Sequence, residues 1–341
     1  MESAPSLGPN FTTKMPSQTH PKSGSSSSMD IEDIFRVIFS AILIPIIVFG
    51  NILVMAAYKT NRRLRTGTYT LLVSLAFCDF LVGSVSVPLW MYTSLSNWKT
   101  GEFLNSFFMG FDYLTALSSS MHLTVICIER WLAISKPFLH QVFRSEQYYA
   151  AIALVWLIAL ALSSLVFIPE VIHPGRIYIL VLVIFGFVAP FIAISFVNAY
   201  IFRVAQKLIH QEPMASTDSA EIEQRNKIQK ERRTAKTLVI ITALFFFELL
   251  PTYVLALLGG FCLKPCLISI GWKGIKSVMN FAKWMQYSNS GINPFVYAFR
   301  DAEMRKTFKR LFTRNMLFRR THTVGNISQT ERQSAQSQAH L

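Results

Sequence analysis

The sequence predicts an all-α fold: a seven-transmembrane helix bundle with a short amphipathic eighth helix. Hydrophobic residues make up 52% of the 341 residues and charged residues only 15%, too few charges to cover soluble domains of this length. The apolar residues gather in seven long blocks, and the basic residues concentrate in alternate loops between them. This composition excludes an ordinary cytosolic enzyme.

Residues 1–30 form a polar, serine-rich segment without the short apolar core of a cleavable signal peptide. We expect a disordered extracellular N-terminus that stays attached, with the first helix acting as its own signal anchor. Asn10 begins an Asn-Phe-Thr sequon, which predicts glycosylation if this end faces outside.

The seven apolar blocks are each long enough to cross the hydrocarbon core as helices that satisfy their own backbone hydrogen bonds. They span residues 35–58, 68–93, 104–134, 149–168, 177–208, 233–259 and 275–299, and together define a bundle over residues 31–299. Basic residues follow the first and third blocks and precede the sixth: Lys59, Arg62, Arg63, Arg65, Lys136, Arg144, Lys227, Lys230, Arg232 and Arg233. Because cytoplasmic loops carry such residues, we expect the N-terminus outside the plasma membrane and the C-terminus in the cytoplasm.

The segment after the seventh block, residues 300–313, has the pattern of an amphipathic helix lying on the inner membrane surface. Its apolar positions Met304, Phe308, Leu311 and Phe312 lie opposite Arg305, Lys306, Lys309 and Arg310. Residues 314–341 are polar and rich in serine and threonine, which predicts a disordered cytoplasmic tail open to kinases. The formal charge of +14 therefore reflects cytoplasmic segments rather than binding to nucleic acid.

A catalytic site is not expected, because no metal-ligand spacing, phosphate-binding loop or nucleophile elbow is visible and the 7 histidines are scattered. A transporter or channel would need intramembrane charges along a continuous path and often an inverted repeat, and neither is visible. The chain is therefore predicted to be neither an enzyme nor a transporter, and to need no cofactor apart from a sodium ion considered below.

Polar residues inside the apolar blocks are costly in lipid, so each is a candidate for function, with hydrogen bonding between helices as the alternative. With certain glycines, prolines and tryptophans they form ordered motifs: Gly50-Asn51, Leu75 to Asp79, Glu129-Arg130-Trp131, Trp156, Pro190, Pro251 and Asn293 to Tyr297. This pattern resembles the rhodopsin-like (class A) G-protein-coupled receptors over residues 31–312. The resemblance implies a receptor that binds an extracellular ligand and activates a heterotrimeric G protein. Arrestin, receptor kinases and membrane lipid are its further expected partners.

Asp79 is a lone carboxylate near the middle of the membrane, where a buried charge needs a cation or polar partners around it. The resemblance implies that it binds an allosteric sodium ion with Ser119, Asn289 and Asn293 as partners. No other metal site is expected.

Arg130 lies at the predicted cytoplasmic end of the third helix, where a guanidinium can reach a carboxylate or the carbonyls of a partner. The resemblance implies that Glu231, before the sixth helix, pairs with Arg130 at rest. Glu129 and Tyr297 complete the predicted switch for the G protein.

Asp112 is the best clue to the ligand. It precedes Arg130 by 18 residues, a rise of about 27 Å in about five turns, so the two lie on one helix face at opposite membrane boundaries. A carboxylate there would form a charge-assisted hydrogen bond with a protonated amine. Trp284 and Tyr287 lie one turn apart, and with Asp112 and the run to Ser290 they resemble the receptors for biogenic amines. These aromatics can enclose an ammonium by cation–π contact, with plain packing as the alternative.

Tyr253 and Lys283 complete the predicted ligand set. Lys283 lies one turn from Tyr287 and opposes a simple amine site, because it could pair with Asp112 itself. It could instead extend toward water, or bind the acidic group of a zwitterionic or peptide ligand. A packing or snorkelling role is therefore weighed beside the binding role.

Several positions depart from the pattern of most class A receptors. Asn105 replaces a cysteine, Glu248-Leu249 replaces a Cys-Trp pair, Asn198 replaces a tyrosine, and Leu182, Val183 and Gly186 stand where catecholamine receptors carry serines. The missing cysteine and a very short second outer loop resemble the melanocortin and adenosine receptor branch. That branch suggests a peptide or nucleoside-like ligand, and the lost tyrosine and tryptophan suggest a constitutively active receptor.

Cys262 and Cys266 lie four residues apart in a predicted outer loop. In an oxidising compartment they could close a small disulfide loop, with two free thiols as the alternative.

Overall fold

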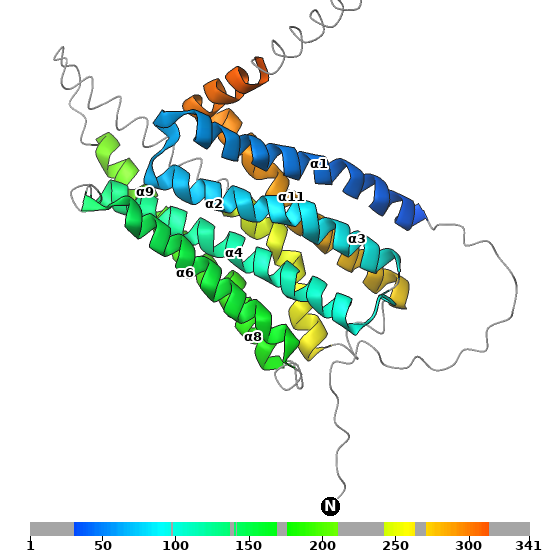
Figure 1. Ribbon diagram of the computed structural model, residues 1–341. Helices are drawn as coiled ribbons and strands as arrows, with labels where there is room; N and C mark the ends of the chain where they lie inside the picture. Colours follow the sequence, from blue (N-terminus) through cyan, green and yellow to red (C-terminus); the bar gives the residue numbers. More distant parts are fainter. Residues whose placement is uncertain are drawn as a thin grey trace, which may run out of the picture.

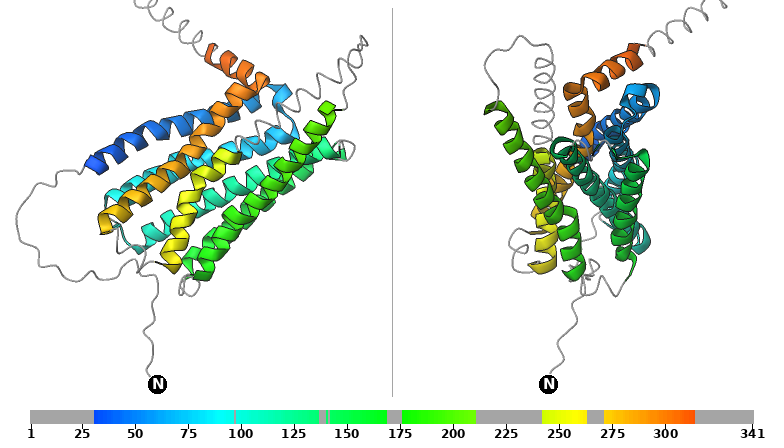
Figure 2. Two further views of the ribbon diagram at one scale, coloured as in Figure 1. Left: turned by 180° about the vertical axis from the view of Figure 1, so that it is seen from behind. Right: turned by 90° about the vertical axis from the view of Figure 1, so that its left-hand side faces the viewer.

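The computed structural model describes residues 31–96, 98–136, 140, 142–168, 176–210, 242–262 and 271–313. Its regular structure there is helical, and the helices run side by side as one bundle (Figures 1 and 2). The main helices are α1 (Ile31–Thr60), α2 (Gly67–Leu81), α3 (Val87–Leu95), α4 (Glu102–Ser135), α6 (Ser145–Ser164), α8 (Arg176–Val183), α9 (Ala189–His210) and α11 (Gly271–Arg300). A helix over Thr242–Phe261, drawn yellow, and a helix over residues 302–313 complete the set.

Two of the membrane crossings are built from shorter helices joined by a π-helical turn. The π turn η2 (Val82–Ser86) joins α2 to α3, and η4 (Ile184–Val188) joins α8 to α9. A π turn shifts the faces of the two helical parts it joins and is often found near functional sites. The second and fifth predicted blocks are therefore single crossings with an irregular turn inside each.

Within the part of the chain that the structure describes, six helical stretches are long and apolar enough to span a membrane: Ile31–Thr60, Gly67–Leu95, Glu102–Ala133, Ser145–Phe167, Arg176–Tyr200 and Thr242–Phe261. The seventh crossing is α11, whose inward positions are polar while outward positions such as Phe281, Phe295 and Phe299 are exposed. Because lipid surrounds the bundle, polar residues lie inside and apolar residues outside. The predicted seven-helix bundle is confirmed, with helix ends within a few residues of the predicted blocks where the structure describes them.

The helix α4 occupies the centre of the bundle and packs against α2, α6 and α9 (Figure 1). On the other side of the bundle, α1 lies close to α11 at Gly50. A Cβ atom added there would lie only 2.9 Å from Cγ of Pro294, so the contact leaves no room for a side chain. Next to it, Nδ2 of Asn51 donates a 3.1 Å hydrogen bond to the carbonyl oxygen of Ser290. These contacts fix α11 against α1 and set the direction in which its polar side chains point.

The helix over residues 302–313 begins after Asp301, whose Oδ1 accepts hydrogen bonds of 2.9 Å from the backbone N–H groups of Glu303 and Met304. An aspartate at this position stabilises the first turn of a helix. Met304 and Phe308 are buried against α1, while Phe312 is 61% exposed. The predicted amphipathic pattern is thus present, and part of its apolar face packs against the helix bundle.

Asn105 ties the first turn of α4 to the preceding loop. Its Oδ1 accepts a 2.7 Å hydrogen bond from Thr100, and its Nδ2 donates a 3.0 Å bond to the carbonyl of Trp98. These two bonds hold the start of α4 against the loop that precedes it.

Cys262 is disulfide-bonded. Its predicted partner Cys266 lies outside the described residues, as do Asn10, Glu231 and the segments 1–30 and 314–341. The pairing, the glycosylation and the two disordered segments stay predictions.

Candidate functional site

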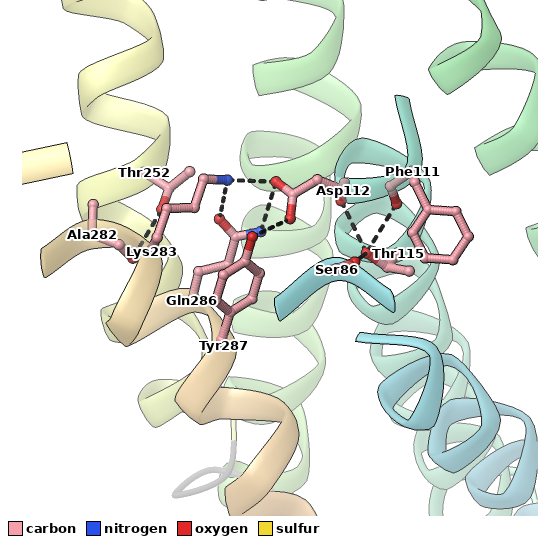
Figure 3. Close-up of polar contacts among 9 residues, drawn as sticks. All are labelled: Ser86, Phe111, Asp112, Thr115, Thr252, Ala282, Lys283, Gln286 and Tyr287. Atoms are coloured by element: carbon pink, nitrogen blue, oxygen red, sulfur yellow. Dashed lines mark hydrogen bonds and ion pairs between the residues drawn. The ribbon is translucent and has the colours of Figure 1, made fainter. Parts of the chain in front are cut away.

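Asp112 is a buried carboxylate on α4, 2% exposed, and α11 provides all of its side-chain hydrogen-bond donors within the described residues (Figure 3). The hydroxyl of Tyr287 donates a 2.9 Å hydrogen bond to Oδ1. Lys283 forms an ion pair with Oδ2, and Nε2 of Gln286 lies 3.4 Å from the same oxygen. The structure thus brings Asp112 of α4 together with Lys283 and Tyr287 of α11, which the sequence placed one turn apart on another helix.

Lys283 points into the bundle rather than outward to water. Its Nζ donates a 3.0 Å hydrogen bond to Oε1 of Gln286 and lies 5.7 Å from the centre of the Tyr287 ring. Only 19% of its side chain is exposed. Of the alternatives left by the sequence, the pairing with Asp112 is the one seen, and the two charges neutralise one another.

Trp284 lies on the side of α11 that faces α1. Its ring centre is 4.9 Å from that of Phe35 and 5.3 Å from that of Phe39. Its Nε1 is buried without a hydrogen-bond partner among the described residues. The ring of Trp284 therefore packs between helices against α1. The aromatic contact to the Lys283 ammonium comes instead from Tyr287.

Tyr253, on the helix Thr242–Phe261, lies against the π turn of the fifth crossing. Its ring centre is 5.1 Å from that of Phe187, and a Cβ atom added to Gly186 would collide with its hydroxyl. Ser120 donates a 2.7 Å hydrogen bond to the carbonyl oxygen of Gly186. The absence of a side chain at Gly186 is therefore what lets Tyr253 take this place.

Asp79 is 1% exposed and lies deeper in the bundle. Nδ2 of Asn293 donates a 2.8 Å hydrogen bond to its Oδ2, and the hydroxyl of Ser119 donates a 3.4 Å bond to its Oδ1. A small cavity beside these groups is lined by polar residues of both sites: Thr115, Ser119, Gln286, Tyr287, Asn289 and Ser290. The four residues predicted around an ion therefore gather in one region, continuous with the surroundings of Asp112.

Glu129 and Arg130 lie at the other end of α4, in a network with Thr68 of α2 and with His140, in the segment between α4 and α6. Nε of Arg130 lies 3.1 Å from Oε2 of Glu129, and Arg130 also donates to the hydroxyl of Thr68. Oε1 of Glu129 accepts a 2.9 Å hydrogen bond from Thr68 and lies 2.8 Å from Nε2 of His140. Tyr297, the other residue of the predicted switch, is half-buried in the hydrophobic cluster beneath the helix over residues 302–313.

A second polar network joins three crossings through a buried histidine. His122, fully buried, lies 2.7 Å from both the hydroxyl of Ser74 and the carbonyl oxygen of Ser118. Nε1 of Trp156 donates a 3.1 Å hydrogen bond to Ser74. These contacts hold α2, α4 and α6 together, so Trp156 has a structural role.

Sequence reasoning did not single out Gln286, Thr68 or His140. Gln286 could have been found, because it lies three residues after Lys283 and so on nearly the same helix face. Thr68 and His140 carry no pattern of their own, and only the packing of α2 and the loop against α4 reveals them.

The sequence is similar to those of known seven-transmembrane receptors, in agreement with the helix bundle described above. The family model for 7 transmembrane receptor (rhodopsin family) matches residues 50–297. Trace amine-associated receptor 7b of Rattus norvegicus is 28% identical over 293 residues, covering 79% of this chain and 80% of the relative. The 5-hydroxytryptamine receptor 2C of Homo sapiens is 26% identical over 322 residues, covering 78% and 69%. Trace amine-associated receptor 9 of Mus musculus is 28% identical over 309 residues, covering 83% and 86%.

The match runs from the Gly50-Asn51 motif in α1 to Tyr297 in α11, and so includes the last part of α1, nearly all of α11 and the crossings between them. This family consists of receptors that couple to G proteins, not of enzymes. The chain therefore belongs to the rhodopsin family of seven-transmembrane receptors.

Proposed function

We propose that this chain is a plasma-membrane receptor for a small extracellular amine, whose ammonium is held by Asp112. One observation carries the proposal: Asp112 is buried, and Tyr287 fixes its Oδ1 through a 2.9 Å hydrogen bond. A carboxylate held in this way is preorganised for a cationic group, and its low exposure strengthens the attraction. The names of the relatives, which include trace amine-associated and 5-hydroxytryptamine receptors, support an amine.

The ligand would act by favouring one of two arrangements of the bundle. Asp112 and Arg130 lie on the same helix, α4, near its opposite ends, so a ligand at one end biases a switch at the other. A small cavity lined by Gln286 and Tyr287, which contact Asp112, and by Ser119, which contacts Asp79, lies between the two sites. Release of Arg130 from Glu129 would then open the G-protein site.

The topology that goes with this function has the N-terminus outside, glycosylated at Asn10, and residues 314–341 in the cytoplasm. The tail would then meet receptor kinases and arrestin. The helix over residues 302–313 would lie on the inner leaflet, with Arg305, Lys306, Lys309 and Arg310 near lipid headgroups.

A sodium ion beside Asp79 is a further part of the proposal. The buried carboxylate, the hydroxyl of Ser119 and the polar residues Asn289 and Asn293 supply oxygen atoms of the kind that sodium prefers, next to a cavity. Replacing NaCl by N-methylglucamine chloride should raise the potency of an agonist in the wild type and leave it unchanged in Asp79→Asn. Equal salt responses of the two proteins would remove the ion from the account.

The main experiment measures G-protein activation in cells that express the wild type, Asp112→Ala or Glu102→Ala. Glu102 is the matched control, because it is an exposed carboxylate in the first turn of the same helix. The probes are phenethylamine, tyramine, tryptamine and 5-hydroxytryptamine, and surface expression is measured in parallel. At least one probe should activate the wild type and Glu102→Ala, and Asp112→Ala should need more than about tenfold more of it. Equal potency in Asp112→Ala would refute the amine anchor.

The pairing of Lys283 with Asp112 favours one second candidate, a receptor with basal activity, because an internal ammonium already occupies the acidic group. Leu249 in the cluster around Phe245 and Phe246 also replaces the usual tryptophan. If this is correct, the wild type without ligand should activate G protein above the level of Arg130→Ala. Equal levels would exclude it.

A further inference from the structure

The ligand site has no net charge before a ligand arrives. Asp112 contributes one negative charge and Lys283 one positive charge, and among the described residues neither has an ion pair with any other group. Arg36, the fully buried cation at the same end of the bundle, is paired with Glu32 and Asp33. A ligand that binds Asp112 therefore meets a carboxylate whose charge is already balanced.

A ligand with an ammonium group alone must displace the Lys283 ammonium or share Asp112 with it. Only 3% of the Asp112 side chain and 19% of the Lys283 side chain are exposed, so water replaces little of what is lost. After displacement, the contacts left to Nζ would be Oε1 of Gln286 and the ring of Tyr287. A buried charge without a counter-charge is costly, and such a ligand would add a second positive charge to a closed site.

We infer that the ligand is a zwitterion, in which the ammonium takes the place of the Lys283 ammonium on Asp112 and an acidic group binds Lys283. This inference rests on the proposed function and specifies the ligand class for the same site. One ion pair becomes two, and the net charge of the site does not change. No buried charge is left without a partner, which is the condition that the closed site imposes.

The geometry of the pair suits this exchange. Lys283 has a flexible four-carbon stem, so its ammonium can swing away from Asp112 while α11 stays in place. Tyr287 donates to Oδ1, the oxygen that Lys283 does not use, and so keeps the carboxylate oriented during the exchange. In an α-amino acid the ammonium and the carboxylate are attached to one carbon, so a single ligand can contact both residues while they remain neighbours.

The amide of Gln286 is placed to support either state. Its Oε1 accepts from Lys283 at 3.0 Å, and its Nε2 lies 3.4 Å from Asp112. Gln286 therefore contacts both charged residues at once. When a zwitterion lies between Asp112 and Lys283, the amide oxygen can still accept from an ammonium and the amide nitrogen can still donate to a carboxylate.

The test compares each amino acid with the amine that lacks only its carboxylate: phenylalanine with phenethylamine, tyrosine with tyramine, and tryptophan with tryptamine. G-protein activation is recorded for wild type, Lys283→Met and Lys283→Arg at matched surface levels. In at least one pair, the amino acid should be more potent than its amine by about tenfold or more on the wild type. Lys283→Arg should keep this order because it keeps the positive charge.

Lys283→Met should reverse the order, because the acidic group loses its partner while Asp112 becomes free for a simple ammonium. If that variant does not reach the surface, Lys283→Gln serves in its place, since its amide can donate to Asp112 without a charge. The inference would be overturned if the amines were more potent than their amino acids on the wild type and acted on Lys283→Met with the same potency as on the wild type. Amine responses that still depend on Asp112 would then leave the proposed function standing. A wild type that responds to neither member of any pair would overturn the inference as well.

Discussion

Nε2 of His140 lies 2.8 Å from Oε1 of Glu129, and Oε2 of the same carboxylate faces Nε of Arg130 at 3.1 Å. His140, in the segment between α4 and α6, and Arg130 of α4 thus share one carboxylate, whose residue is only 5% exposed. Thr68 donates to the same oxygen as His140. Among the described residues, Glu129 is therefore the carboxylate that holds Arg130 in the position seen in the structure.

Glu129→Gln should raise basal G-protein activation. The amide keeps the size and can still accept from Thr68, but it removes the charge that holds Arg130. Breaking this coupling should change the balance between states by roughly fivefold or more. Ligand-free activation at matched surface levels is the measurement, with Glu146→Gln, an exposed carboxylate in the first turn of α6, as control. Unchanged basal activity would show that the pair does not restrain Arg130.

Ser74→Ala should lower the thermal stability of the receptor without touching the ligand site. It would leave Nε1 of Trp156 without its acceptor and the ring of His122 without one of its two hydrogen bonds. Each unsatisfied buried group costs about 1–3 kcal/mol. The purified protein should melt several degrees below the wild type. Ser84→Ala is the control, because among the described residues its hydroxyl bonds to the carbonyl of Phe80 in the same crossing and to no other helix. Equal melting temperatures for the two variants would argue against the network.

Gly186→Ala should weaken the response to an agonist, because the new methyl group would collide with the Tyr253 hydroxyl and lie 3.0 Å from Cδ2 of Leu117. Tyr253→Phe removes the colliding oxygen, so the double variant should recover part of the potency lost in Gly186→Ala. Concentration–response curves for the three variants measure this. Losses that simply add would mean that Tyr253 and Gly186 do not act on the ligand through one contact.

Much of the fold could be predicted because lipid gives a strong signal along the chain. A helix that crosses the membrane must satisfy its backbone hydrogen bonds within itself, so long apolar blocks identify it. The polar face of α11 was predictable for the same reason, since residues such as Asn293 are tolerated only inside the bundle. The π turns η2 and η4 were not predicted, because a single wider turn leaves no periodic pattern in the sequence.

The candidate site could be predicted only in part. Helical spacing showed that Lys283 and Tyr287 share a face of α11, but it does not give the distance from α11 to α4. That distance depends on tertiary contacts such as the approach of Gly50 to Pro294, so the pairing of Lys283 with Asp112 had to be left open. For Trp284 the sequence left enclosure of the ligand and plain packing open, and its ring packs against Phe35 and Phe39 of α1.

The most direct test of the account measures nucleotide exchange on a purified heterotrimeric G protein by the receptor in lipid nanodiscs. The wild type is compared with Asp112→Asn and with Asp112→Asn/Lys283→Met, which removes both charges and so leaves no unpaired lysine. With the most potent compound from the cellular assays, both variants should lose roughly 2–5 kcal/mol of ligand binding, seen as more than a tenfold rise in half-maximal concentration. A double variant that responds as well as the wild type would contradict the claim that Asp112 holds the ligand.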